Sequence, residues 1–365
     1  MKKVAITGVT LGLLLGVFFT AQWGYSAAQK RDKWIYALAN PNFLPGIAFL
    51  WVGDHPKLNF YKQEGIDMEW RGVAGATTCV QHLLRKQVDS CALIQDQVLL
   101  QAAEGNKFPI TFVYDYTYKI TNEFAVKPDS PVKNVSDLKG KKVGILSLAH
   151  DTYKYGQLVF QRLGFKPNDV EFLATGLGPQ AAELLYQERV DALLLFDIVW
   201  PQFKFIGKPV RVLPQPDFIA AVKAGPIIGA RTEDVKNRPD VIVRTFRAHT
   251  KSMLFTIENP EAALHIHFEM HPETLPKGLS YEKAFEQTLP VVKARLPAVE
   301  KKLADVQYYG EFNPEGWKAY VTDVLGLELK KVNPADFYTN QFAKEVNNFD
   351  EAGLRKWARE FKYKK

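Results

Sequence analysis

The 365-residue chain is 47% hydrophobic and 24% charged, and it carries a formal net charge of +7. This composition is typical of a folded globular protein and excludes a fibrous or intrinsically disordered chain. Lys and Arg are scattered along the sequence instead of being massed in runs, which argues against a nucleic-acid groove. The mild positive charge favours an anionic ligand or surface without establishing either one.

The N-terminal segment has the pattern of a secretory signal peptide. A short basic start precedes a mostly apolar run over residues 4–20, and a small-residue site ends at Ala28. We therefore predict export to the periplasm with cleavage near Ala28. The alternative is an uncleaved membrane anchor, because the apolar run is of marginal length for a span and Trp23 and Tyr25 suit an interface.

Strands and helices alternate through the first third of the chain. We expect strands at 33–39, 66–70, 89–94 and 110–114, with helices at 44–52 and 78–86 and a further helix that runs to about 105. The chain has two cysteines, Cys79 on the second of these helices and Cys91 on the following strand. They could pair in an oxidising compartment, but the sequence leaves the disulfide open because it does not give their Cα separation.

A second module begins near Asn122. Its expected strands lie at 124–126, 142–146, 170–174 and 192–196, with helices near 153–163 and 179–188. From about 231 the chain is largely helical, with amphipathic periodicity over 240–258 and 261–270. The alternation predicts an α/β fold with mainly parallel sheets flanked by helices, followed by a helical C-terminal extension.

The most informative motif is VSDLKGKKVGI at 135–145. It predicts a short helical turn, a tight turn around Gly140 and a buried strand that ends in a polar loop. Ligands bind at such strand ends in open α/β sheets. Together with VDALLLFDIVW, NPEAALHI and FYTNQFAKEVNNFD, this block resembles the periplasmic solute-binding proteins of ABC importers, in the branch that binds thiamine pyrimidines, sulfonates, taurine and nitrate.

The resemblance implies the two-lobe type II binding-protein fold. The first lobe would comprise 29–118 and 226–365, and the second lobe 119–225, with crossing segments near 117–123 and 213–225. The lobes would close on a small molecule by a hinge motion and deliver it to an ABC permease in the inner membrane. The resemblance implies a monomer that uses no cofactor, metal or nucleic acid and is not an enzyme.

Loops at the carboxyl ends of strands are expected to line the cleft. The candidate ligand-binding residues are Asn40, Asn42, Phe43, Gly75, Thr77, Gln95, Asp96, Tyr116, Asn122, His150, Asp151, Thr152, Tyr153, Gly178, Asp197 and Trp200. Several have structural alternatives: an Asn-Pro turn at 40–42, helix capping at Thr77 and at 95–97, hinge packing by Tyr116, and lobe packing by Trp200.

The nature of the ligand is a further hypothesis. Tyr116, Tyr153 and Trp200 suggest a planar or aromatic molecule. Helix N-termini and the net positive charge suggest that it carries a carboxylate or sulfonate.

Two motifs suggest other functions, and the absence of a third argues against one. Residues 176–181 match a dinucleotide fingerprint, but Pro179 enters the helix start and the expected export argues against a nicotinamide cofactor. His267 and His271 share a helix face as metal ligands can, although a solvated face is the default. The fungal pyrimidine synthases of this fold carry a cysteine-rich motif that is absent here. An exported enzyme, a metal-binding protein and a sensing partner of a membrane receptor remain alternatives.

Overall fold

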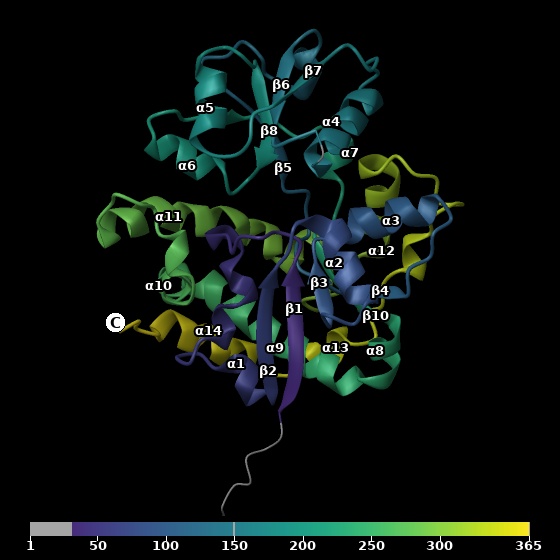
Figure 1. Ribbon diagram of the computed structural model, residues 1–365, viewed down its shortest axis with the longest axis vertical. Helices are drawn as coiled ribbons and strands as arrows, with labels where there is room; N and C mark the ends of the chain where they lie inside the picture. The colour runs from purple at the N-terminus through teal and green to yellow at the C-terminus, as the bar shows by residue number, and fades with distance from the viewer. Residues whose placement is uncertain (1–30, 149, 365) are drawn as a thin grey trace, which may run out of the picture. The chain divides into compact units, whose positions relative to one another are not determined.

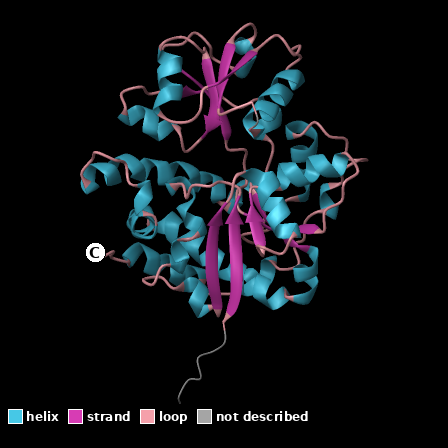
Figure 2. Cartoon of the chain, viewed as in Figure 1, coloured by secondary structure: helices cyan, strands magenta, loops and turns pink. Residues whose placement is uncertain are grey.

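The computed structural model describes residues 31–148 and 150–364. The predicted signal peptide therefore lies outside the described residues. Residues 31–365 cluster as one unit, and within it the strands form two separate sheets with helices on both sides (Figure 2). Across the described part of the chain, no helix combines the length and apolar character needed to cross a membrane.

The first sheet has the strand order β2-β1-β3-β10-β4 (Figure 1). Its strands are β1 (Asp32–Leu38), β2 (Ile66–Gly72), β3 (Ser90–Ala92), β4 (Ile110–Asp115) and β10 (Ile227–Arg231). The pairs of β1 with β2 and β3 are parallel, whereas β10 runs antiparallel to both of its neighbours. We call this sheet and the helices packed around it lobe 1.

The second sheet has the order β7-β6-β8-β5-β9. Its strands are β5 (Asn122–Val126), β6 (Lys142–Ile145), β7 (Glu171–Ala174), β8 (Ala192–Phe196) and β9 (Arg211–Val212). The pairs of β6 with β7 and β8 are parallel, and β5 is antiparallel to β8 and β9. We call this sheet and its helices α4–α7 lobe 2. The antiparallel strand of each sheet, β10 in the first and β5 in the second, is therefore the first strand that the chain forms after it passes from the other lobe.

The helices follow the alternation that the sequence predicts. Lobe 1 contains α1 (Phe60–Gln63), α2 (Gly75–Leu84), α3 (Gln95–Ala103), α8 (Thr232–Asn237), α9 (Pro239–Glu258), α10 (Pro260–Met270), α11 (Tyr281–Arg295), α12 (Pro314–Ala319), α13 (Ala343–Val346) and α14 (Glu351–Glu360). Lobe 2 contains α4 (Asp151–Arg162), α5 (Pro179–Tyr186), α6 (Trp200–Phe205) and α7 (Asp217–Ala220). The predicted helical C-terminal extension is confirmed by α8–α14.

Two helix predictions need correction. The helix expected over 44–52 is a pair of short 3-10 helices, Pro45–Leu50 and Val52–Asp54, with non-helical backbone at Ile47. The helix expected from Thr78 begins three residues earlier at Gly75, whose φ of +85° ends the preceding loop. Thr77 is therefore inside α2 and is not its N-cap.

The 135–145 motif folds as predicted. Val135–Leu138 is a 3-10 turn closed by a capping box of Asn134 and Asp137. Gly140 has a φ of +77°, which glycine adopts without strain, and its N–H donates to the Asp169 carbonyl at 2.6 Å. The strand β6 that follows is buried from Val143 onward.

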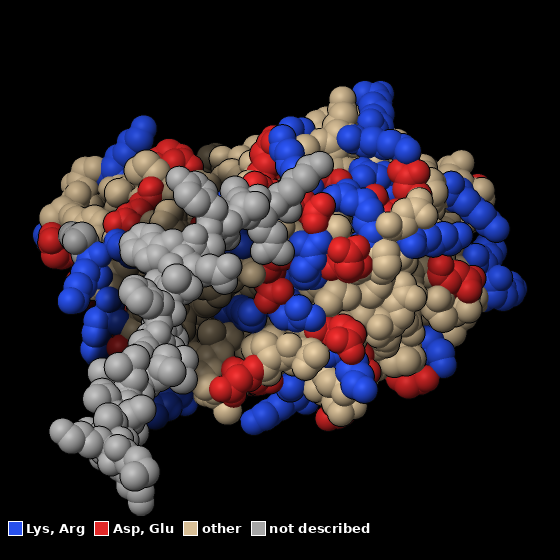
Figure 3. Space-filling view, turned by 90° about the horizontal axis from the view of Figure 1, so that it is seen from below, with Lys and Arg blue, Asp and Glu red and all other residues tan. Residues whose placement is uncertain are grey.

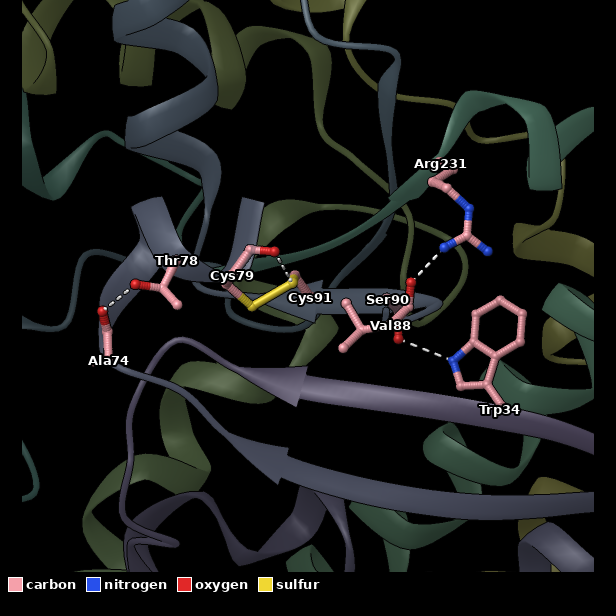
Figure 4. Close-up of a disulfide and its surroundings, with 8 residues drawn as sticks. All are labelled: Trp34, Ala74, Thr78, Cys79, Val88, Ser90, Cys91 and Arg231. Atoms are coloured by element: carbon pink, nitrogen blue, oxygen red, sulfur yellow. Dashed lines mark hydrogen bonds between the residues drawn. A yellow bond between two sulfur atoms is a disulfide. The ribbon is translucent and has the colours of Figure 1, made fainter. Parts of the chain in front are cut away.

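The two cysteines are joined in a disulfide that ties α2 to β3 (Figure 4). Both residues are fully buried, and their Cα atoms are 6.1 Å apart. On the other side of β3, Ser90 accepts a hydrogen bond from the buried Trp34 indole at 2.9 Å. The bridge therefore fixes α2, and with it the loop at Gly75, against the first sheet.

The described surface seen in Figure 3 mixes charges of both signs. Ion pairs such as Arg31–Asp67 and Arg244–Asp32 connect neighbouring elements at the amino end of the first sheet. Such interspersed charge gives no single-sign field over this face.

Candidate functional site

A cavity of about 580 Å³ is lined by residues of both lobes. Lobe 1 contributes the loop after β1 together with residues from the end of α10 to α11, and lobe 2 contributes the start of α5 and one side of α6. The lining residues are Pro41, Asn42, Phe43, Leu44, Pro45, Pro179, Gln202, Phe203, Ile206, Glu273, Thr274, Pro276, Gln287, Thr288 and Val291. Its volume lies in the range of small-molecule sites.

The loop after β1 is held in place before any ligand arrives. The Asn42 N–H donates to the Asn40 side-chain oxygen at 2.9 Å, the local turn that asparagine favours. Phe43 stacks on His271 with 4.1 Å between ring centroids and meets Trp51 edge-on at 5.2 Å. Asn42 and Phe43 thus line the cavity as predicted candidates, while Asn40 shapes the turn.

The lobe 2 wall is built around the start of α5. Gly178 caps this helix with a φ of +81°, and Pro179 is its first residue. Proline has no N–H, so the helix end that reaches the cavity presents a ring where another residue would present a donor. The remaining lobe 2 wall comes from α6, through Gln202, Phe203 and the adjacent Ile206.

The third wall is α11, which packs against α6 of lobe 2 and against the 3-10 helix Pro45–Leu50 of lobe 1 (Figure 1). Val291 belongs to the same apolar cluster as Val199, Trp200 and Phe203 of lobe 2. Thr288 is buried and donates its hydroxyl to the Ala284 carbonyl at 2.7 Å. The helix therefore contacts both lobes along one face.

A buried ion pair connects the lobes behind this wall. Arg295, at the end of α11, contacts both carboxylate oxygens of Asp197 at distances of 2.7 to 3.0 Å. Each side chain is only 5% exposed. Glu123 lies in the same cluster and accepts a hydrogen bond from the Trp200 indole at 2.8 Å. Burial, followed by the charge of Asp197, raises the pKa of Glu123.

This arrangement gives Asp197 and Trp200 structural partners. The Asp197 carboxylate is engaged by Arg295, and Trp200 is 8% exposed within the lobe 2 core. Trp200 thus packs within lobe 2, which is the structural alternative that the sequence suggested for it. Neither residue lines the cavity in this conformation.

The tyrosines near the first crossing segment are also buried. Tyr114 hydrogen-bonds Thr250 at 2.9 Å, and the Tyr118 hydroxyl accepts from the Gly310 N–H at 2.9 Å. Tyr116 is fully buried and packs on Phe49, with 5.9 Å between centroids. Burial raises the pKa of Tyr116. In this conformation the three rings pack at the crossing and expose no surface to a ligand.

The candidates on α2 and α3 form a polar network with the C-terminal region. The Thr77 hydroxyl donates to the Gln97 side chain at 3.2 Å. Gln95 donates its amide to the Tyr320 hydroxyl at 3.2 Å, and that hydroxyl donates to Asp96. Tyr320 opens a π-helix, Tyr320–Val324, an irregularity that is frequent at functional sites. At Gly75, no heavy atom lies within 4 Å of the position that a Cβ would occupy.

The candidates at the start of α4 cap that helix. His150 is its N-cap and accepts from the Thr152 N–H at 3.2 Å, while Asp151 is its first residue. Thr152 is buried, and the Tyr153 ring meets Phe172 edge-on at 5.2 Å. On β5 nearby, the Asn122 carbonyl accepts from Gln215 at 2.6 Å. None of these residues lines the described cavity, so their contact with a ligand stays a prediction.

The histidine pair, His267 in α10 and His271 just after it, does not form a solvated face, which corrects the default expectation. His267 is fully buried and receives the Trp51 indole N–H at 3.2 Å, with the Thr274 hydroxyl 3.0 Å from its other nitrogen. Burial, with a smaller effect of His271, lowers the pKa of His267 to about 3. His271 stacks on Phe43 and hydrogen-bonds Glu273 at 3.2 Å. The pair therefore supports the cavity wall.

Sequence reasoning missed much of the lobe 1 wall. Gln287, Thr288 and Val291 share one face of α11 by their spacing, and Glu273 follows the end of α10. The amphipathic pattern of 281–295 was the available signal. Gln202 and Ile206 were also missed, although their four-residue spacing places them on one side of α6.

Comparisons with known proteins give the family. The NMT1/THI5-like family model matches residues 48–263, which is more than half of the chain. The chain belongs to the NMT1/THI5-like family. No curated protein matches it.

Solved structures similar to this NMT1/THI5-like protein share its fold at low sequence identity. The alkanesulfonate-binding protein of Xanthomonas axonopodis pv. citri, bound to MOPS, is 13% identical with a TM-score of 0.56, over 85% of this chain and 99% of that one. A putative periplasmic sulfonate-binding protein of Methylobacillus flagellatus KT is 15% identical with a TM-score of 0.57, over 89% and 96%. A desulfurization enzyme is 15% identical with a TM-score of 0.54, over 87% and 99%. The fold is therefore that of the type II periplasmic binding proteins.

Proposed function

We propose that this protein is the extracytoplasmic solute-binding component of an ABC importer. It captures a small organic molecule between its lobes and presents the closed form to a permease. The observation that carries the proposal is the cavity of about 580 Å³ whose walls come from both lobes. The family and the fold support it, because one structural relative is described as an alkanesulfonate-binding protein and another as a periplasmic sulfonate-binding protein.

The physical basis of capture is that a ligand contacts both lobes at once. A molecule that touches Phe43 of lobe 1 and Phe203 of lobe 2 binds the closed form more tightly than the open form, and so shifts the population toward closure. The loop after β1 is already held by the Phe43–His271 stack, which reduces the ordering cost of binding. The N-terminal segment supports export of the chain to the periplasm.

An enzyme on the same fold is a second candidate, since one structural relative is a desulfurization enzyme. The cavity favours binding instead. Among the described residues, those that line it include one carboxylate, Glu273, and two hydroxyls, Thr274 and Thr288, but no Ser, Cys or His. The Thr274 hydroxyl donates to the His271 carbonyl at 2.7 Å and the Thr288 hydroxyl donates to the Ala284 carbonyl at 2.7 Å, so neither donates its proton to a base as an activated nucleophile does.

The test is retention of a solute together with lobe closure. Protein purified from its own periplasm is examined by native mass spectrometry, and X-ray scattering is recorded before and after removal of the retained molecule. We expect a small molecule bound at one per chain and a larger radius of gyration once it is removed. The Phe43→Ala variant should lose the molecule, whereas Phe205→Ala, an exposed α6 residue that does not line the cavity, should keep it. An identical scattering profile in both states would contradict the proposal, as would conversion of the molecule into a product.

A further inference from the structure

We propose that the ligand of this cavity is an uncharged molecule with a largely apolar body and one or two amide- or hydroxyl-type groups. This inference rests on the proposed function and names its ligand class. It departs from the carboxylate or sulfonate that the sequence suggested, because the described walls of the cavity provide no positive charge.

The charge of the walls is the first argument. No Lys or Arg is among the described residues that line the cavity, and the one charged lining side chain is the acidic Glu273. Glu273 is 65% exposed and is engaged by His271. The arginine at the end of α11, Arg295, is engaged by Asp197. An anion that entered the cavity would lose hydration without gaining a cationic partner, which is strongly unfavourable.

The backbone of the walls gives the second argument. Anions in proteins are often held by backbone N–H groups at helix N-termini. The helix N-terminus that reaches this cavity begins with Pro179, which has no N–H. Three further prolines, at 41, 45 and 276, also line the cavity. Pro179 thus removes one N–H donor from this helix end, and the proline rings add apolar surface to the walls, so the lining offers an anion fewer donors than a helix N-terminus usually does.

The side chains of the walls give the third argument. Phe43, Leu44, Phe203, Ile206 and Val291 supply an apolar surface for the body of a ligand. Gln202 and Gln287 face it from opposite lobes, and each carries both a donor and an acceptor. These side-chain amides can exchange hydrogen bonds with the amide or hydroxyl of a neutral molecule. Of the apolar lining residues, Ile206 is 37% exposed, so part of the apolar lining faces solvent.

The experiment compares three probes that share one body and differ in charge: 2-phenylacetamide, phenylacetate and 2-phenylethylamine. Binding to the full mature protein, after removal of retained solute, is measured by calorimetry. A probe of about ten heavy atoms should bind in roughly the millimolar range or tighter. We expect the amide to bind about tenfold more tightly than either charged probe, a difference of about 1.4 kcal/mol. Equal or tighter binding of the acid or the amine overturns the inference, and so does failure of the amide to bind.

A charge added to the wall provides the matched test. Gln202→Lys places a cation in the cavity lining and should raise the affinity for phenylacetate about tenfold relative to the amide. Gln187→Lys adds the same charge to an exposed residue at the end of α5, outside the lining, and should leave the preference for the amide unchanged. If both variants shift the preference equally, the net charge of the protein and not the cavity governs selectivity, and the inference fails.

The two proposals fail in different ways. If phenylacetate binds best and scattering still shows closure, the ligand class is wrong and the solute-binding function stands. If the amide binds as expected, but the lobes do not close and no solute is retained from the periplasm, the cavity has the stated preference and the transport function is wrong.

Discussion

At the residue scale, the fully buried histidine of α9 is, with His267, one of two buried histidines among the described residues that make the stability of the fold sensitive to acid. His249 is 0% exposed, stacks near Tyr36 and Tyr114, and burial lowers its pKa to about 3. In the unfolded chain its pKa is about 6.5. Below pH 6.5 the unfolded state therefore binds a proton that the folded state excludes. The stability it contributes is present above pH 6.5 and is lost as the pH falls toward 3.

The prediction is that the free energy of unfolding falls between pH 6.5 and pH 3, with a contribution from His249 of at most about 1.4 kcal/mol per pH unit. Urea unfolding at several pH values measures this slope. The His249→Phe variant should show a shallower slope than the parent protein, whatever its stability at pH 7. His82→Phe, at a partly exposed residue of α2, serves as the control. A slope in His249→Phe as steep as in the parent would exclude this origin.

At the element scale, a buried ion pair connects Arg295 at the end of α11 with Asp197, which follows β8. Asp197 and Arg295 are each 5% exposed, so removal of either partner leaves an uncompensated buried charge. Removal of both partners leaves no uncompensated buried charge. A single substitution should therefore lower the free energy of unfolding more than substitution of both partners.

We expect Arg295→Met to lower the free energy of unfolding by about 3–5 kcal/mol, and the Asp197→Leu/Arg295→Met double variant to recover much of that loss. Chemical denaturation of the three proteins gives the comparison. Lys318→Met, which breaks an exposed pair with Glu315, should cost about 0–1 kcal/mol. A double variant that is less stable than the Arg295 single variant would show that the pair itself is strongly net favourable.

Elements with strong local signals were predictable from sequence, and tertiary arrangements were not. The 135–145 motif folds as expected because Asn134, Asp137 and Gly140 satisfy their backbone locally. The loop at Asn42 and Phe43 was placed at the cavity because strand ends in α/β sheets meet ligands. The α11 wall was not found, since its function depends on which lobe 2 helix packs against it. The helix expected over 44–52 is instead two 3-10 helices with non-helical backbone at Ile47, next to Gly46, whose close packing against Ile198 of lobe 2 is a tertiary contact with no local signal.

At the scale of the whole molecule, a glycine sets how closely the lobes approach. Gly46 lies in the 3-10 helix Pro45–Leu50 of lobe 1, and a Cβ at this position would lie 2.6 Å from the Ile198 side chain of lobe 2. Gly53 is similarly crowded, but by Ser252 within lobe 1 at 2.7 Å. The two positions therefore separate an effect on closure from an effect on packing.

Gly46→Ala should move the equilibrium toward the open form, because the added methyl group cannot fit between the closed lobes. We expect a larger radius of gyration by X-ray scattering and weaker binding of the retained solute. Gly53→Ala should reduce thermal stability and leave the radius of gyration of the folded protein unchanged. If Gly46→Ala closes as fully as the parent protein, the contact with Ile198 yields easily and does not limit closure.

The helix α11 has a consequence for release of the cargo. Its Val291 lies in one apolar cluster with Phe203 of α6. Separation of the lobes therefore exposes these apolar side chains to water. The ligand-free, open protein should therefore bind a solvatochromic dye that the ligand-bound, closed protein does not bind. If the protein delivers its solute to a permease as proposed, the docked permease would have to cover this apolar surface while the lobes are apart.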